Sequence, residues 1–156
     1  MIRSVILLFT FFIISCNANK SFIDYIKPEF DIVSFDVVQK QLVIEQELPS
    51  HLKNMISQWF NQKVKIDGFD GDIKFIISDF DQDISSIDDG KRVDVSLSFK
   101  VLLNKPSLSK TKVIEGNVTS FGELTGNFSL AELDKVIENT QVDLILRLSR
   151  DLKSKI

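Results

Sequence analysis

The stretch Arg92–Leu103, RVDVSLSFKVLL, decides the fold class. Its residues alternate between apolar and polar. The apolar set is Val93, Val95, Leu97, Phe99, Val101 and Leu103, and the polar set is Asp94, Ser96, Ser98 and Lys100. This period of two places the sets on opposite faces of a β-strand, one buried and one in water. The fold must therefore contain a layer that covers the apolar face.

Shorter patterns predict further strands. Asp31–Glu45 alternates on both sides of a polar break and is read as one bent strand or a hairpin. Ile73–Ser78 is apolar on both faces, which favours an inner strand. Thr111–Ser120 is a further strand. Between these, Asp79–Gly90 is expected to form an acidic loop, and the glycine-rich Phe121–Phe128 a bulge or loop.

The first expected helix carries one apolar stripe at helical spacing. Its members are Leu52, Met55, Ile56, Trp59 and Phe60. Ser50 is the expected N-cap, because its hydroxyl can accept a free backbone N–H in the first turn. The helix should stop near Lys65.

The last helix opens with the capping box Ser129-Leu130-Ala131-Glu132. Its apolar residues continue at helical spacing to about Lys155. That length predicts either an end that stands clear of the domain or a bend at Asn139-Thr140.

The expected order is β-α-β-β-β-α. We predict an α+β two-layer sandwich in which a mostly antiparallel sheet of about four strands carries two helices on one face. Residues 31–156 are expected to form this single domain.

The N-terminus has the layout of a signal peptide. Arg3 precedes the apolar run Val5–Ile14, and Ser15 stands before Cys16, the single cysteine. Ile13-Ile14-Ser15-Cys16 resembles the bacterial lipobox, which implies removal of residues 1–15, lipidation of Cys16 and a lipidated tether over residues 16–30. The alternative is an ordinary secretory signal cut elsewhere.

Composition narrows the possible partners. The whole chain has a formal charge of −3, and removal of Arg3 with the signal peptide makes it −4. No cluster of four basic residues occurs, which argues against nucleic acid. The membrane is therefore expected to be held through the N-terminal lipid. Asn17 after the cysteine favours the outer membrane, on its periplasmic side.

Candidates for catalysis and metal binding are weak. Asp79, Asp81 and Asp83 have the spacing that starts a calcium loop, but Ile84 and Gly90 occupy the positions where an EF-hand needs Gly and Glu. Asp67, Asp70 and Asp72 could also be considered as metal ligands, and a solvated surface is again the favoured interpretation. The single histidine, His51, is expected to be exposed. We therefore predict no metal, no cofactor and no enzyme, with a carboxylate hydrolase as the third hypothesis.

One helix face is polar without being charged. Its members are Asn54, Ser57, Gln58, Asn61 and Gln62. Depletion of charge is typical of surfaces that dock on protein. We read this set as a possible partner-binding face, and an ordinary solvated surface is the competing interpretation.

The element order resembles that of small envelope lipoproteins. Pro49, Trp59 and the turn Gly68-Phe69-Asp70-Gly71 resemble features of uncharacterised alphaproteobacterial lipoproteins. The order of elements over Asp31–Ile156 resembles the LptE-like lipopolysaccharide-assembly lipoproteins. These resemblances imply a periplasm-facing module that binds an envelope protein, a lipid or a glycolipid. The alternative is a small-ligand or lipid-binding module with a pocket near Trp59 and Phe75.

Overall fold

The computed structural model describes residues 30–156. The predicted signal peptide, Cys16 and nearly all of the tether lie outside the described residues, so the division of the chain into leader, tether and domain stays a prediction. Within the described part, no helix is long and apolar enough to span a membrane.

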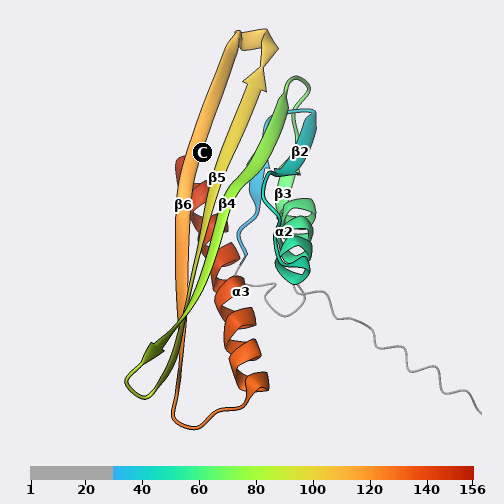
Figure 1. Cartoon of the computed structure of the whole chain (residues 1–156). Coiled ribbons are helices and arrows are strands. Elements are labelled where there is room, and N and C mark those ends of the chain that lie inside the picture. The colour runs from blue at the N-terminus through green and yellow to red at the C-terminus, as the bar shows by residue number, and fades with distance from the viewer. Residues whose placement is uncertain (1–29) are drawn as a thin grey trace, which may run out of the picture.

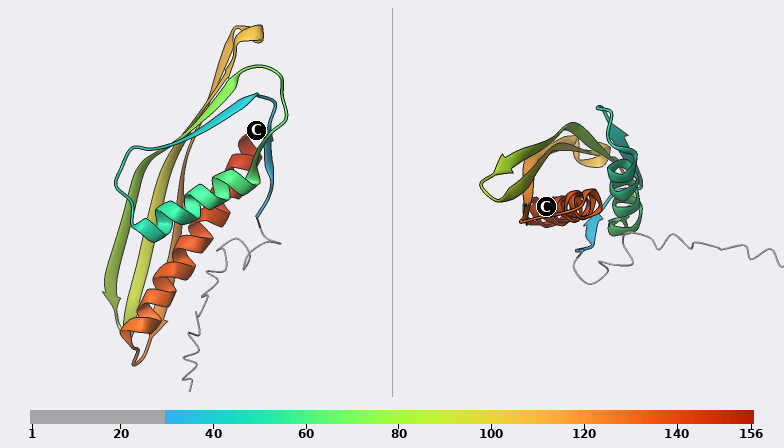
Figure 2. Two further views of the ribbon diagram at one scale, coloured as in Figure 1. Left: turned by 90° about the vertical axis from the view of Figure 1, so that its right-hand side faces the viewer. Right: turned by 60° about the horizontal axis from the view of Figure 1, so that its bottom comes forward.

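The described chain consists of six strands, two α-helices and one short 3-10 turn. In order these are β1 (Val33–Phe35), β2 (Gln39–Ile44), α2 (Ser50–Lys63), β3 (Val64–Ile66), β4 (Asp72–Ile87), β5 (Gly90–Lys105), η1 (Pro106–Leu108), β6 (Lys110–Thr125) and α3 (Leu130–Lys155). Figure 1 shows the three long strands side by side, and Figure 2 shows both helices on one side of the sheet. The predicted α+β class and element order are confirmed.

The main sheet has the order β2-β4-β5-β6, and β1 and β3 form a separate parallel pair. The long strands are antiparallel to each other, whereas β2 runs parallel to β4. Asp31–Glu45 is therefore neither one bent strand nor a hairpin. Its two halves serve different sheets, because the chain turns at Val37 and Val38, whose N–H groups donate to the carbonyls of Phe35 and Gly71.

Two predicted loops are strands instead. The acidic stretch after Ser78 continues β4, and its residues from Asp79 to Ile87 pair with β5 up to the Asp88-Asp89 turn. The glycine-rich stretch likewise continues β6 to Thr125. Gly122 belongs there because a Cβ on it would lie 2.4 Å from the Thr140 hydroxyl oxygen of α3. Pairing with β5 overrides the local loop signals in both stretches.

The start of α2 also differs from the prediction. Pro49 occupies the N-cap position, no side chain caps the helix, and Ser50 is its first residue. The helix ends at Lys63 because Val64–Ile66 pairs with β1. All five residues of the predicted apolar stripe are buried, as expected.

Helix α3 keeps its predicted capping box. The Ser129 hydroxyl accepts the Glu132 N–H, and the Glu132 carboxylate accepts the Ser129 N–H. The helix runs without interruption through Asn139-Thr140. Its C-terminal half does not stand clear of the domain, since Leu144, Leu148 and Leu152 are fully buried.

An aromatic cluster joins α2 to the centre of the sheet. The rings of Phe75 and Phe99 are stacked with centroids 5.7 Å apart, and Trp59 meets Phe75 edge-on at 5.5 Å. All three side chains are almost completely buried. Among the described residues, the Trp59 Nε1–H has no hydrogen-bond partner. The cluster therefore holds α2 through apolar contact rather than through a buried polar network.

Replacing Phe75 with alanine is expected to lower the free energy of unfolding by about 3–5 kcal/mol, because it removes a ring that touches three others and leaves a cavity. Phe69→Ala is the matched control, since Phe69 is 99% exposed and its removal should change stability by less than about 0.5 kcal/mol. Urea unfolding of both variants gives the comparison. Similar losses for the two would contradict the described core.

The capping box predicts a dependence of stability on pH. Hydrogen bonds from the Ser129 backbone and hydroxyl lower the pKa of the Glu132 carboxyl. A depressed folded-state pKa stabilises the fold above the unfolded value of about 4.3, and this stabilisation is lost as the pH falls through the folded value. Glu132→Gln should therefore be less stable than the parent at pH 7, with the difference closing by pH 3 in urea titrations. A difference that persists at pH 3 would contradict this role.

Candidate docking surfaces

The outward side of α2 carries the polar residues singled out from the sequence. Asn54, Asn61 and Gln62 are exposed, whereas Ser57 and Gln58 are half-buried. The Ser57 hydroxyl donates to the Lys53 carbonyl, so it is already engaged within the helix. Lys53 itself is exposed, one turn before Ser57. Helical spacing thus places the five residues on one side of α2, three of them exposed and two half-buried.

Lys40 of β2 holds the far end of this helix. Its amine donates to the carbonyl oxygens of Phe60 at 3.1 Å and Asn61 at 3.2 Å, and it also reaches the carbonyl of Val64. Burial lowers the pKa of Lys40, and the nearby Lys65 lowers it further. A cation at a helix C-terminus offsets the partial negative charge there. The polar face of α2 is therefore fixed relative to the sheet.

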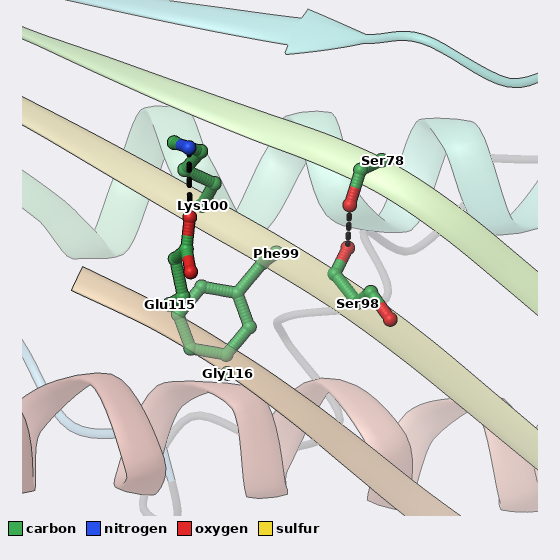
Figure 3. Close-up of a pocket in the computed structure, with 6 residues that line it drawn as sticks. All are labelled: Ser78, Ser98, Phe99, Lys100, Glu115 and Gly116. Atoms are coloured by element: carbon green, nitrogen blue, oxygen red, sulfur yellow. Dashed lines mark hydrogen bonds and ion pairs between the residues drawn. The ribbon is translucent and has the colours of Figure 1, made fainter. Parts of the chain in front are cut away.

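The outer face of the sheet, opposite the helices, bears an open hollow (Figure 3). Its walls are Ser78, Ser98, Phe99, Lys100, Glu115 and Gly116. Lys100 pairs with Glu115 at 2.7 Å, and the Ser78 hydroxyl donates to the Ser98 carbonyl. Since these polar groups satisfy each other, the hollow presents few free donors or charges.

A second hollow lies further along the same face, around Arg92 and Phe121. The guanidinium lies 4.3 Å from the centre of the exposed Phe121 ring and bonds to Asp94 and Glu123. Its hydrogen bonds lower the pKa of Asp94. The charged groups around this hollow therefore pair with one another.

The outer edge of β4 is only half paired. β2 pairs with Asp72–Ile77, and one further rung is made by the Gln46 side chain, which donates to the Phe80 carbonyl and accepts the Phe80 N–H. Beyond Phe80 no neighbouring strand follows among the described residues, and Figure 1 shows β4 running on past the end of β2. Backbone groups alternate between the two sides of a strand. The N–H and C=O groups of Gln82, Ile84 and Ser86 therefore face the open edge.

The acidic residues considered as metal ligands occupy two places. Asp79, Asp81 and Asp83 are exposed on β4, where strand alternation sets them along one face instead of around an ion. In the other group, hydrogen bonds from the Ser107 side chain and from the Ser107 N–H, at 2.9 Å, lower the pKa of Asp70. Within residues 30–156, no three His, Cys, Asp or Glu side chains are placed to hold a metal ion.

The other two members of the second group, Asp72 and Asp67, differ in their surroundings. Asp72 accepts a hydrogen bond from the Asn104 side-chain amide at 3.1 Å, which links β4 to β5. Asp67 is exposed in the loop before β4. His51 is exposed as expected, and its Nε2 lies 3.6 Å from a Glu138 carboxylate oxygen. Neither the aspartates nor His51 therefore lie in an arrangement of nucleophile, base and orienting acid among the described residues.

The open edge is the feature that sequence reasoning missed. Its signal was present, since aspartates at every second position from Asp79 to Asp83 have the period of a strand. The same spacing also matches the start of a calcium loop. Only the pairing with β5 shows which reading applies.

Comparison with known proteins finds a similar fold in a solved structure. No protein-family model matches the chain, and neither does any curated protein. The chain is similar to the crystal structure of a minor lipoprotein from Acinetobacter baumannii, with a TM-score of 0.53 and 8% identity over 76% of this chain and 93% of that one. A rare lipoprotein B from Shewanella oneidensis aligns over 75% of this chain and 92% of its own, with a TM-score of 0.49 and 14% identity. A putative neuraminyllactose-binding hemagglutinin homolog from Helicobacter pylori aligns over 79% of this chain and 89% of its own, with a TM-score of 0.27 and 10% identity. At these identities, the likeness to the Acinetobacter lipoprotein establishes a shared fold.

Proposed function

We propose that this protein is a lipid-anchored envelope lipoprotein without enzymatic activity, which binds another envelope component on the periplasmic side of the outer membrane. The observation that carries the proposal is the outward face of α2. It gathers Asn54, Asn61 and Gln62 in the open, on a helix that the aromatic cluster and Lys40 hold in place. A fixed polar surface without charge on its five members suits protein docking, because desolvating amides costs less than desolvating ions.

The anchor is proposed from the sequence. Ser15-Cys16 and the apolar run before it fit lipoprotein processing, and the fold shared with a bacterial lipoprotein supports the same class. Acyl chains would supply the membrane affinity, at about 0.8 kcal/mol for each buried CH₂. The chain's negative charge gives no help on an anionic surface.

We propose that this binding serves envelope biogenesis or the transport of lipid or lipopolysaccharide. The support is the LptE-like order of elements in the sequence. The competing small-ligand role needs space between α2 and the sheet. Contacts among Trp59, Phe75 and Phe99 occupy the centre of that layer, so docking is the favoured role.

Labelling and crosslinking in cells together test this function. Radiolabelled palmitate should be incorporated into the parent protein and not into a Cys16→Ser variant, which should leave the membrane fraction. A photo-crosslinking p-benzoylphenylalanine at Asn61 should trap an envelope protein or glycolipid. The matched control places it at Glu115 on the outer sheet face, where we expect at least tenfold less product.

Each arm has a result that contradicts its part of the proposal. An unlabelled parent protein, or a Cys16→Ser variant with unchanged membrane attachment, would exclude lipid anchoring. Equal crosslinking from Asn61 and Glu115, or none from either, would exclude docking through α2.

A further inference from the structure

The open part of the β4 edge has the features of a strand-binding site. Gln46 imitates one rung of a neighbouring strand at Phe80 with two hydrogen bonds of 2.8 and 2.9 Å. Among residues 30–156, no partner meets the outward backbone groups of the next three alternate residues, Gln82, Ile84 and Ser86. An extended chain placed there would lie beside β4 in the same position that β2 occupies along Asp72–Ile77.

Charge distinguishes the outer side of this edge. The carboxylates of Asp79, Asp81 and Asp83 are exposed along it, and no described cation pairs with them. Asp94, which lies opposite Asp83 on β5, is by contrast already bonded to Arg92. A strand added here therefore meets a row of unneutralised negative charge.

Apolar groups mark the inner side. Ile84 is 39% exposed and lies in one row with Val93 and Gly122, and Gly122 faces Val136 and Thr140 of α3. The neighbouring α3 residues Leu133 and Ile137 are only partly buried. On the paired half of β4, Leu42 and Ile44 of β2 lie beside Phe75 and Ile77 and pack against the core. Among the described residues, no strand lies beside Ile84 on this side of β4.

We propose that an extended segment of a partner protein adds to β4 along Gln82–Ser86 as a further strand. Its backbone would pair with the open edge, its Lys or Arg side chains at alternate positions would face Asp81 and Asp83, and its apolar side chains would cover Ile84. Strand addition of this kind takes affinity from backbone bonds and specificity from alternate side chains. This site is separate from the polar face of α2 and goes beyond the proposed function.

Charge argues for a partner protein over a second copy of this chain. Two β4 edges paired with each other would bring Asp81 and Asp83 against like charges, which is destabilising across strands. The other edge strand, β6, is a weaker candidate because Lys155 of α3 already donates to its Glu115 carbonyl. The partner's chemistry is therefore a basic, extended segment.

Crosslinking from the edge tests the proposal in cells that produce the full chain. With p-benzoylphenylalanine at Ser85, we expect a product whose crosslinked peptide carries Lys or Arg at alternate positions. Ser86→Pro should reduce the product at least tenfold, because it removes an outward N–H without removing a β4–β5 bond. Ser86→Ala keeps that N–H and should preserve the product. Asp81→Asn with Asp83→Asn should reduce it at least threefold, and the exposed Asp134→Asn should leave it unchanged. Unfolding midpoints of the purified variants establish that each remains folded.

The remaining outcomes would overturn the proposal. These are absence of a product, equal product from Thr119 on β6, or a product from a folded Ser86→Pro variant that equals that of Ser86→Ala. A crosslinked peptide without alternating basic residues would also overturn it. So would a peptide from residues 17–29 of this chain or from β4 of a second copy, since each identifies a different occupant.

Discussion

The pairing of β4 with β5 is the interaction on which the rest of the structure depends. Each strand has sixteen residues, and their pairing runs from Asp72 opposite Asn104 to Ile87 opposite Gly90, with one register shift between Ile77 and Asp79. At about 3.3 Å per residue, such a pair spans roughly 50 Å. By comparison β2 has six residues and α2 fourteen, each about 20 Å long. The elements before β4 therefore cover only part of the sheet, and α3 crosses the rest.

This difference in length determines where the molecule is closed and where it is open. Where all layers overlap, Trp59, Phe75 and Phe99 fill the interior. Beyond Gln46 the sheet continues without β2, so the edge and Ile84 stay accessible. The outer face has no helix over it. On β5 and β6 its charged groups pair with one another, as in Lys100–Glu115, whereas the aspartates of β4 have no cation partner among the described residues. The exposed face of α2 and the open edge of β4 are therefore the two surfaces that we propose for binding.

Much of the fold follows from local patterns in the sequence. The stripe from Leu52 to Phe60, the alternation along β5 and the capping box at Ser129 each report their own environment, and all three predictions hold. The predictions fail where distant pairing decides. Asp79–Ile87 and Phe121–Thr125 look like loops because aspartate and glycine are poor strand formers, yet β5 lies between them and pairs with both. The split of Asp31–Glu45 between two sheets depends on β3 and β4, which no local pattern in that stretch encodes. The polar face of α2 was predictable because helical spacing alone defines it, whereas the open edge required knowledge of where β2 stops.

The most direct test of this account is amide hydrogen exchange along β4. The account predicts slow exchange through Ile73–Ile77, where strands flank β4 on both sides. Beyond Phe80 it predicts an alternation, with fast exchange at Gln82, Ile84 and Ser86 and slow exchange at Asp81, Asp83 and Ser85. Uniformly fast exchange from Asp79 to Ile87 would indicate that this stretch is a loop and would contradict the long strand. Uniformly slow exchange in the isolated protein would show that the edge is already covered.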